Sequence, residues 1–116
     1  MAMLPNNIFL KILSKEIPAR VIHEDEHCLA FHDADPQAPI HVLLIPKKVI
    51  RTHANLADED AAVMGHLHIT AAKLARDLGL AAGYRLVLNC DEAGGQTVPH
   101  LHLHLMGGRD FDWPPG

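Results

Sequence analysis

The stretch that decides the fold of this chain covers residues 99–106 and reads Pro99-His100-Leu101-His102-Leu103-His104-Leu105-Met106. Side chains on a β-strand point alternately to its two faces. The stretch therefore predicts a strand with three leucines buried on one face and three imidazoles on the other, neighbouring rings being roughly 6.5–7 Å apart. Histidine is also unusually abundant, with ten in 116 residues. The histidine face is the first place to look for chemistry.

The sequence on either side predicts an α+β domain built on an antiparallel sheet. Apolar residues recur at helical spacing in a short segment that Asn6 caps and that runs to Ser14. A longer helix is predicted over residues 58–78, where Gly79 supplies a left-handed end. Extended segments are predicted at residues 20–23, 27–33, 40–45, 84–89 and 98–106.

Length and composition exclude several classes of protein. A chain of 116 residues fits one domain, here residues 1–116, and 48% apolar with 21% charged residues excludes a disordered protein. A net charge of −4 without a basic stripe excludes charge-driven binding of nucleic acid. No run approaches 18 apolar residues and the start lacks an export signal, so neither a membrane association nor secretion is expected. Cys28 and Cys90 are then expected to be reduced thiols in a cytoplasmic protein.

Three interpretations of the histidine face compete. It is a polar face toward solvent, a site for zinc or copper, or the nucleophile and donors of a phosphate-handling site. A closed structural metal site would need a second Cys or His pair nearby, which the sequence does not supply. Directly upstream, Gly94-Gly95-Gln96-Thr97 favours the phosphate interpretation, because small residues let backbone amides and a hydroxyl approach an anion. No metal and no other cofactor is therefore expected.

The run from Gly94 through the triplet to Arg109 resembles the His-x-His-x-His-x-x signature of the histidine triad (HIT) superfamily. Within that superfamily it is similar to the histidine triad nucleotide-binding proteins, which form the purine nucleoside phosphoramidase branch. Further similar stretches follow in order along nearly the whole chain: Ile8-Phe9, residues 15–19, 29–33, 36–39, His41, 45–48, 78–80 and the closing Trp113-Pro114-Pro115-Gly116.

The resemblance implies a fold, an assembly and an activity. The fold is a single HIT domain with an antiparallel five-stranded sheet, one long helix and one short helix. The assembly is a homodimer with a continuous sheet, in which the tail, residues 107–116, lies at the dimer interface and the active site. The activity is hydrolysis of the P–N bond of adenosine or guanosine 5′-phosphoramidates through a nucleotidyl-histidine, releasing AMP or GMP and an amine. Aminoacyl-adenylates are a further candidate substrate.

Two alternatives to this activity stay open. One is a dinucleoside polyphosphate hydrolase of the same superfamily, which shares the triplet and Gln96-Thr97. The other is a regulatory protein that binds a nucleotide or zinc. The closing Trp113-Pro114-Pro115-Gly116 favours the phosphoramidase.

The resemblance also implies the catalytic residues. His102 would attack the α-phosphorus, and the carbonyl of His100 would hold the proton of His102 on its other ring nitrogen. His104 would donate to a non-bridging phosphate oxygen. His41, the one polar residue in the apolar segment 40–45, would lie beside the triplet on the neighbouring strand, and a core histidine satisfied by backbone is its alternative.

The nucleotide-binding residues follow in the same way. Asp33 would accept hydrogen bonds from both ribose hydroxyls, with an ordinary strand-end or turn residue as the alternative. Asn89 would hold the phosphate or ribose side, and Thr97 would touch the phosphate or the leaving nitrogen. Gln96 is a further nucleotide-binding candidate, and Trp113 would reach the substrate across the dimer. The base pocket would be lined by Ile8, Phe9, Phe31 and Ile45, for which core packing is the alternative.

Two residues depart from the family pattern, and six histidines are left over. Pro99 stands where an aromatic residue is common, and Thr97 stands where serine or an acidic residue is usual. Because proline cannot donate to a strand ladder, Pro99 must face an edge or begin the pairing. The remaining histidines are interpreted as surface or structural residues: His23, His27, His32, His53, His66 and His68.

Overall fold

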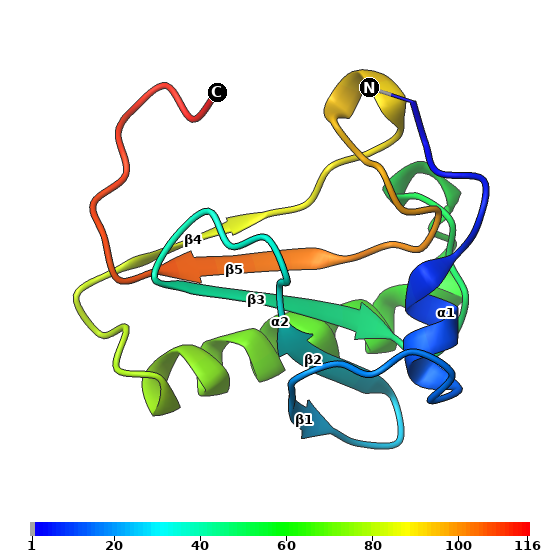
Figure 1. The fold of residues 1–116 in the computed structure, drawn as a ribbon, viewed down its shortest axis with the longest axis horizontal. Helices are drawn as coiled ribbons and strands as arrows, with labels where there is room; N and C mark the ends of the chain where they lie inside the picture. The colour runs from blue at the N-terminus through cyan, green and yellow to red at the C-terminus, as the bar shows by residue number, and fades with distance from the viewer. Residues whose placement is uncertain (1) are drawn as a thin grey trace.

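The computed structural model describes residues 2–116, so Met1 of the predicted domain lies outside the described residues. Five strands form one antiparallel sheet in the order β1-β2-β3-β5-β4 (Figure 1). They are β1 (Val21–Glu24), β2 (Cys28–His32), β3 (Ile40–Pro46), β4 (Tyr84–Val87) and β5 (Leu103–Gly107). The long helix α2 (Ala61–Asp77) and the short helix α1 (Ile8–Leu13) complete the fold. This confirms the predicted α+β class with an antiparallel five-stranded sheet.

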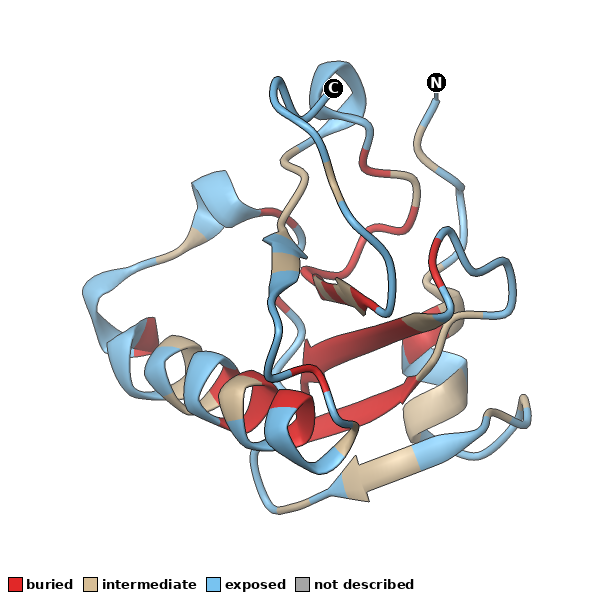
Figure 2. Ribbon diagram, turned by 90° about the vertical axis from the view of Figure 1, so that its left-hand side faces the viewer, coloured by how far each residue is buried: buried red, intermediate tan, exposed pale blue. Residues whose placement is uncertain are grey.

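The two faces of the sheet bury two different apolar layers, as the strand alternation predicts. On the face that packs against α2, Cys28 and Ala30 of β2 lie in one layer with Leu103 and Leu105 of β5 and with Leu67 of the helix. The opposite face carries the second layer, whose members are Phe9, Leu29, Phe31, Leu43, Ile45 and Val98. Figure 2 shows the buried residues concentrated in the middle strands and on the inner side of α2. The sheet therefore separates a helix-covered side from the side where α1 lies.

Both helices begin later than the sequence predicts. The short helix is capped by Asn7 rather than Asn6, because the Asn7 side chain accepts a hydrogen bond from the backbone amide of Leu10 at 3.0 Å. The segment Asp58–Asp60 forms a 3-10 turn, so α2 starts only at Ala61. The predicted left-handed end is confirmed, since Gly79 has φ +77.

The last strand is shorter than predicted, and its beginning is the main correction to the fold. Pairing between β3 and β5 runs from Ile40–Gly107 to Leu44–Leu103, and residues 98–102 precede the strand as an irregular segment. In this segment the backbone bonds elsewhere: the amide of Leu101 donates to the carbonyl of Ile50 at 2.6 Å. Pro99 therefore needs no partner in the ladder, which explains how a proline is accepted beside the triplet.

Two other strands also end earlier than the sequence predicts. The strand predicted over residues 84–89 ends at Val87, and Asp33 follows β2 instead of belonging to it. Within residues 2–116, none of the helices combines the length and the apolar character needed to cross a bilayer.

Gly107 gives a direct test of the packing between β5 and the segment after α2. A Cβ on Gly107 would lie 2.6 Å from a methyl carbon of the buried Leu80 side chain. Gly107→Ala is expected to lower the free energy of unfolding by about 1–3 kcal/mol through overpacking. Gly65→Ala is the matched control, because no atom lies within 4 Å of its Cβ on the exposed side of α2.

The control is expected to raise the free energy of unfolding by about 0.5–1 kcal/mol, since alanine is the better helix former. Denaturant titration measures both variants. Equal effects of the two substitutions would show that Gly107 is not packed as described.

Candidate active site

A cleft of about 790 Å³ opens on the side of the sheet where α1 lies. Seven of the predicted site residues line it: Ile8, Phe9, Phe31, Asp33, Thr97, His102 and His104. The helix α1 contributes Ile8 and Phe9, the end of β2 contributes Phe31 and Asp33, and the segment into β5 contributes the rest. The wall is largely apolar, with a few polar groups converging at one end, as ligand sites commonly are.

His102 carries a defined proton. Its Nδ1 lies 2.8 Å from the carbonyl oxygen of His100, and because that oxygen can only accept, Nδ1 must be the protonated nitrogen. Nε2 therefore keeps its lone pair. The ring is 6% exposed and packs edge-on against Phe9, with ring centroids 5.0 Å apart. Burial lowers the pKa of His102 against the opposing effect of the His100 carbonyl, so the imidazole is neutral at pH 7.

His100 does not lie in the row of rings that the alternation predicts. It falls in the irregular segment before β5, is fully buried, and uses both ring nitrogens inside the protein. Its Nε2 donates to the carbonyl of Pro46 at 2.8 Å, and its Nδ1 accepts from the Asn7 amide at 2.9 Å. Burial lowers the pKa of His100 as well. The contribution of His100 to the cleft is its backbone carbonyl, which holds His102.

The rings that lie side by side, tilted against one another, are those of His102, His104 and His41. Ring centroids are 5.0 Å apart between His102 and His104 and 5.2 Å apart between His104 and His41. The expected position of His41 beside the triplet, on β3, agrees with this arrangement. The row therefore crosses from one strand to the next instead of following one strand.

Hydrogen bonds also decide where the protons of His41 and His104 lie. The backbone amide of Gln37 donates to Nδ1 of His41 at 3.0 Å, so a neutral His41 carries its proton on Nε2. That Nε2 lies 2.9 Å from Nδ1 of His104 and donates to it. A neutral His104 is thereby protonated on Nε2, its remaining nitrogen.

Both of these histidines are held neutral. Burial lowers the pKa of His41 despite the opposing charges of Asp33 and Asp35. Burial and the neighbouring His102 and His41 lower the pKa of His104 to about 4. The cleft therefore presents one imidazole that accepts a proton or attacks, His102, beside one that donates, His104.

Asp33 lies at the polar end of the cleft. Its Oδ1 accepts from the backbone amide of Asp35 at 2.8 Å, and its Oδ2 lies 3.4 Å from Nε2 of His41. Donor atoms of Asp33, His41 and His104 all lie within 4.8 Å of one another, a spacing that suits a metal ion. A metal here would have to break the bond between the two imidazoles.

Six predicted site residues are absent from the lining of the cleft: His41 and His100, which are placed above, and Ile45, Gln96, Asn89 and Trp113. Ile45 is fully buried in the apolar layer, so the expectation that it lines the pocket is wrong. The side chain of Gln96 is buried and bonds the amide of Asp91 and the carbonyls of Arg51 and Val98, so it shapes the loop and offers nothing to a ligand. The other two are Asn89, which lies against the turn at Gly95, and Trp113, which is 85% exposed on the tail.

The sequence did not predict several residues that bond the site histidines or line the cleft. Asn7 bonds His100 across 93 positions in the chain, and the amide of Gln37 sets the proton of His41. Arg20 and His32 also line the cleft. The cap was predicted at Asn6, one residue before Asn7, and nothing local in the sequence indicates that the Asn7 side chain bonds His100.

The buried histidines predict how stability depends on pH. The ordinary pKa of 6.5 holds for the unfolded chain, whereas the pKa of His104 is about 4 in the folded protein. Between these values the unfolded chain binds the extra proton, so the free energy of unfolding is expected to be fully present above pH 6.5 and to fall as the pH drops toward 4. Denaturant titration at each pH measures this fall.

His104→Gln is expected to make the fall shallower, because it removes one of the depressed pKa values. His53→Gln, at an exposed position, is the matched control. An identical slope in the wild type and His104→Gln would contradict the assignment.

Comparisons with known proteins agree with this architecture. The family model described as "HIT domain" matches residues 14–111. An uncharacterised HIT-like protein of Synechocystis is 53% identical over 114 residues, covering 98% of this chain and 100% of that protein. The crystal structure of a HIT family hydrolase from Legionella pneumophila superimposes with a TM-score of 0.93 at 52% identity, covering 96% of this chain and all of the other.

A second solved structure carries a more specific description. It is a histidine triad nucleotide-binding protein from Candida albicans, with a TM-score of 0.80 and 29% identity, covering 96% of this chain and 85% of the other. The family match spans most of the chain and includes the cleft histidines. This chain therefore belongs to the HIT family.

Proposed function

We propose that this protein is a purine nucleoside phosphoramidase, which hydrolyses the P–N bond of adenosine or guanosine 5′-phosphoramidates and has aminoacyl-adenylates as a further candidate substrate. The observation that carries the proposal is the 2.8 Å hydrogen bond from His102 Nδ1 to the His100 carbonyl. It leaves Nε2 of a neutral imidazole free to attack phosphorus. The names of the Legionella hydrolase and of the Candida nucleotide-binding protein support the substrate class.

In the first step, Nε2 of His102 attacks the α-phosphorus and the P–N bond breaks. The leaving nitrogen takes a proton from solvent and departs as the amine, and the nucleotidyl group stays on His102. The ring now carries a positive charge, which the His100 carbonyl stabilises through Nδ1–H. Nε2–H of His104 donates to a non-bridging oxygen, where charge collects in the transition state.

In the second step, water attacks the same phosphorus and the bond to His102 breaks. AMP or GMP leaves, one proton of the attacking water passes to solvent, and the imidazole returns to its neutral form. A charged imidazole is a good leaving group, so one difficult displacement becomes two easier ones. The second step needs no new group in the cleft. These roles require no metal.

The nucleotide is proposed to lie along the cleft with its phosphate at the histidines. Asp33 has an oxygen facing the cleft and accepts the ribose hydroxyls. Ile8, Phe9 and Phe31 form the apolar wall against which a purine packs. Thr97 also lines the cleft, and its hydroxyl is proposed to meet the phosphate or the leaving nitrogen. Asn89 lies against the turn at Gly95 and is proposed to hold the phosphate or ribose side.

We further propose that the single HIT domain of residues 1–116 works as a homodimer in the cytoplasm. The edge strand β4 exposes Tyr84 and Leu86 along its unpaired backbone groups, and α2 exposes a further apolar side chain, Ile69. A partner's β4 against this edge would continue the sheet. The exposed Trp113 on the tail, residues 107–116, would then reach the partner's cleft. The two free thiols, Cys28 and Cys90, suit a reducing compartment.

His102→Ala tests the nucleophile. We expect at least about a thousandfold loss of kcat on an adenosine phosphoramidate, because no other group in the cleft replaces a nucleophile. Affinity for AMP should be retained, since the ring acts on phosphorus only during reaction. His53→Ala, at an exposed position, is the matched control. Mass spectrometry of the wild type quenched during turnover should find one nucleotidyl group on residues 98–107.

Near wild-type turnover by His102→Ala, or an adduct on another residue, would contradict the mechanism. If the wild type hydrolyses a diadenosine polyphosphate faster than the phosphoramidate, His102 would remain the proposed nucleophile, but the proposed substrate class would be wrong.

The tail gives a separate prediction about specificity. Deleting residues 111–116 should change the ratio of kcat/KM between two different amine leaving groups several-fold, because Trp113 would contact the leaving group. Trp113→Ala in the full chain should do the same while changing the free energy of unfolding by less than about 0.5 kcal/mol, as exposed positions do. Steady-state kinetics on paired substrates measures the ratio. An unchanged ratio in both variants would refute the role of the tail.

A further inference from the structure

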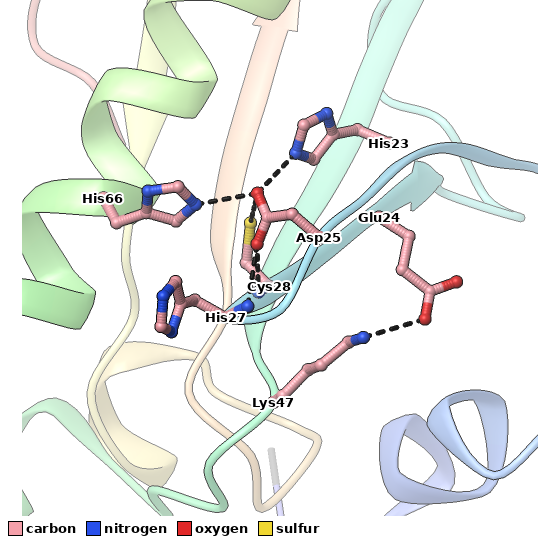
Figure 3. Close-up of polar contacts among 7 residues, drawn as sticks. All are labelled: His23, Glu24, Asp25, His27, Cys28, Lys47 and His66. Atoms are coloured by element: carbon pink, nitrogen blue, oxygen red, sulfur yellow. Dashed lines mark hydrogen bonds and ion pairs between the residues drawn. The ribbon is translucent and has the colours of Figure 1, made fainter.

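A second polar cluster lies on the other side of the sheet, where the β1–β2 hairpin meets α2 (Figure 3). Its centre is Asp25, in the turn between the two strands. One carboxylate oxygen, Oδ1, accepts the backbone amides of His27 at 2.8 Å and Cys28 at 3.0 Å. These two bonds hold the carboxylate in place and direct its other oxygen, Oδ2, toward the helix.

Three further side chains converge on Oδ2 of Asp25. Nε2 of His23 and Nε2 of His66 each lie 2.7 Å from it, and Sγ of Cys28 lies 3.5 Å from it. Figure 3 shows the two imidazoles approaching from opposite sides, one from β1 and one from α2, with the sulfur between them and the strand. Glu24 is not part of this set, because it pairs with Lys47 at 2.9 Å.

The fold places these groups together for reasons independent of local sequence. His23 pairs with Ala30 across the hairpin, and Ala30 lies in the layer that packs against α2, so His23 points to the same side. Cys28 belongs to that layer too, with Leu67 of the helix. His66 precedes Leu67 on α2, and its side chain approaches Asp25 from the helix.

The donor set has the composition of a zinc site. Two imidazole nitrogens, one carboxylate oxygen and one sulfur are the ligand types that zinc takes in four-coordinate structural sites, at about 2.0–2.3 Å. Donor atoms of His23, Asp25 and Cys28 all lie within 4.8 Å of one another, and His66 meets the same oxygen.

We propose that His23, Asp25, Cys28 and His66 form a structural site for zinc that fastens the β1–β2 hairpin to α2. On binding, the metal takes the place of the hydrogen bonds to Oδ2, and the thiol proton of Cys28 passes to solvent as a thiolate–zinc bond forms. Strand β1 lies at the edge of the sheet and buries little surface, so packing stabilises it weakly. A metal link to α2 would stabilise this strand.

This site differs in kind and in place from the cleft. The cleft lies on the α1 side of the sheet, and the cluster lies on the α2 side. The inference departs from the expectation that the chain takes no metal, and it does not rest on the proposed phosphoramidase activity. A metal here acts on stability and leaves the reacting histidines alone.

Titration of the metal-free full-length chain with Co²⁺ tests the proposal. Cobalt takes zinc's place and reports its ligands, so one equivalent should give tetrahedral d–d bands and a thiolate-to-cobalt charge-transfer band. His23→Gln and His66→Gln should each weaken binding by at least about tenfold, as loss of a ligand does. His68→Gln, at an exposed position on the same helix, and Cys90→Ser should bind as the wild type does.

The thiolate band separates this site from the histidine row, because the row contains no sulfur. Cys28→Ser should abolish the band. Since Cys28 is buried, circular dichroism checks that this variant folds, and the two histidine variants keep the test decisive if it does not. Zinc should also raise the unfolding midpoint of the wild type but not that of His66→Gln.

Three outcomes would overturn the proposal. They are binding without a thiolate band, a band that is lost only in Cys90→Ser, and equal affinity in wild type and both histidine variants. Any of them would leave Asp25 as a hydrogen-bonding centre that joins the hairpin to the helix without a metal.

Discussion

The cleft depends on one hydrogen bond, from Nδ1 of His102 to the carbonyl of His100. A histidine free in water exchanges between two neutral forms, and only one of them presents Nε2 as a base or nucleophile toward the cleft. The carbonyl selects that form. The carbonyl is itself held, because the His100 ring is anchored at both nitrogens, by Pro46 at the end of β3 and by Asn7 at the start of α1. Two elements distant in sequence thus set the protonation of one ring.

Burial makes this selection effective. Burial disfavours the charged form of an imidazole, so His41, His100, His102 and His104 all have lowered pKa values. A neutral imidazole with one nitrogen committed as donor has the other available. The two hydrogen bonds from the Gln37 amide to His41 and from His41 to His104 act in the same way. They leave the proton of His104 on Nε2, which faces the cleft as a donor. Neighbouring rings of one chemical type therefore perform opposite roles.

The sheet keeps different chemistry on its two faces. The α1 face carries the aromatic wall and the reacting imidazoles, while the α2 face carries the leucines of β5 and the cluster around Asp25. Because side chains alternate along every strand, neighbouring residues lie on opposite faces and contribute to different layers. Cys28 and Leu29 are neighbours in sequence, yet one lies beside the helix and the other in the layer behind the cleft.

The alternation at residues 101–106 determined by itself that leucines would be buried on one side and that His102 and His104 would face the other, because the period of two is a property of the extended backbone. The Gly94–Thr97 approach and the matching stretches also pointed to the family. What local sequence could not decide was where the strand begins, that the ring of His100 leaves the predicted row to bond Pro46 and Asn7, and that Ile45 and Gln96 lie behind the surface. Those outcomes depend on partners such as Asn7, Pro46 and Ile50, which meet these residues only after the chain has folded. Buried polar groups need hydrogen-bond partners, and only the tertiary structure determines which residues those partners are.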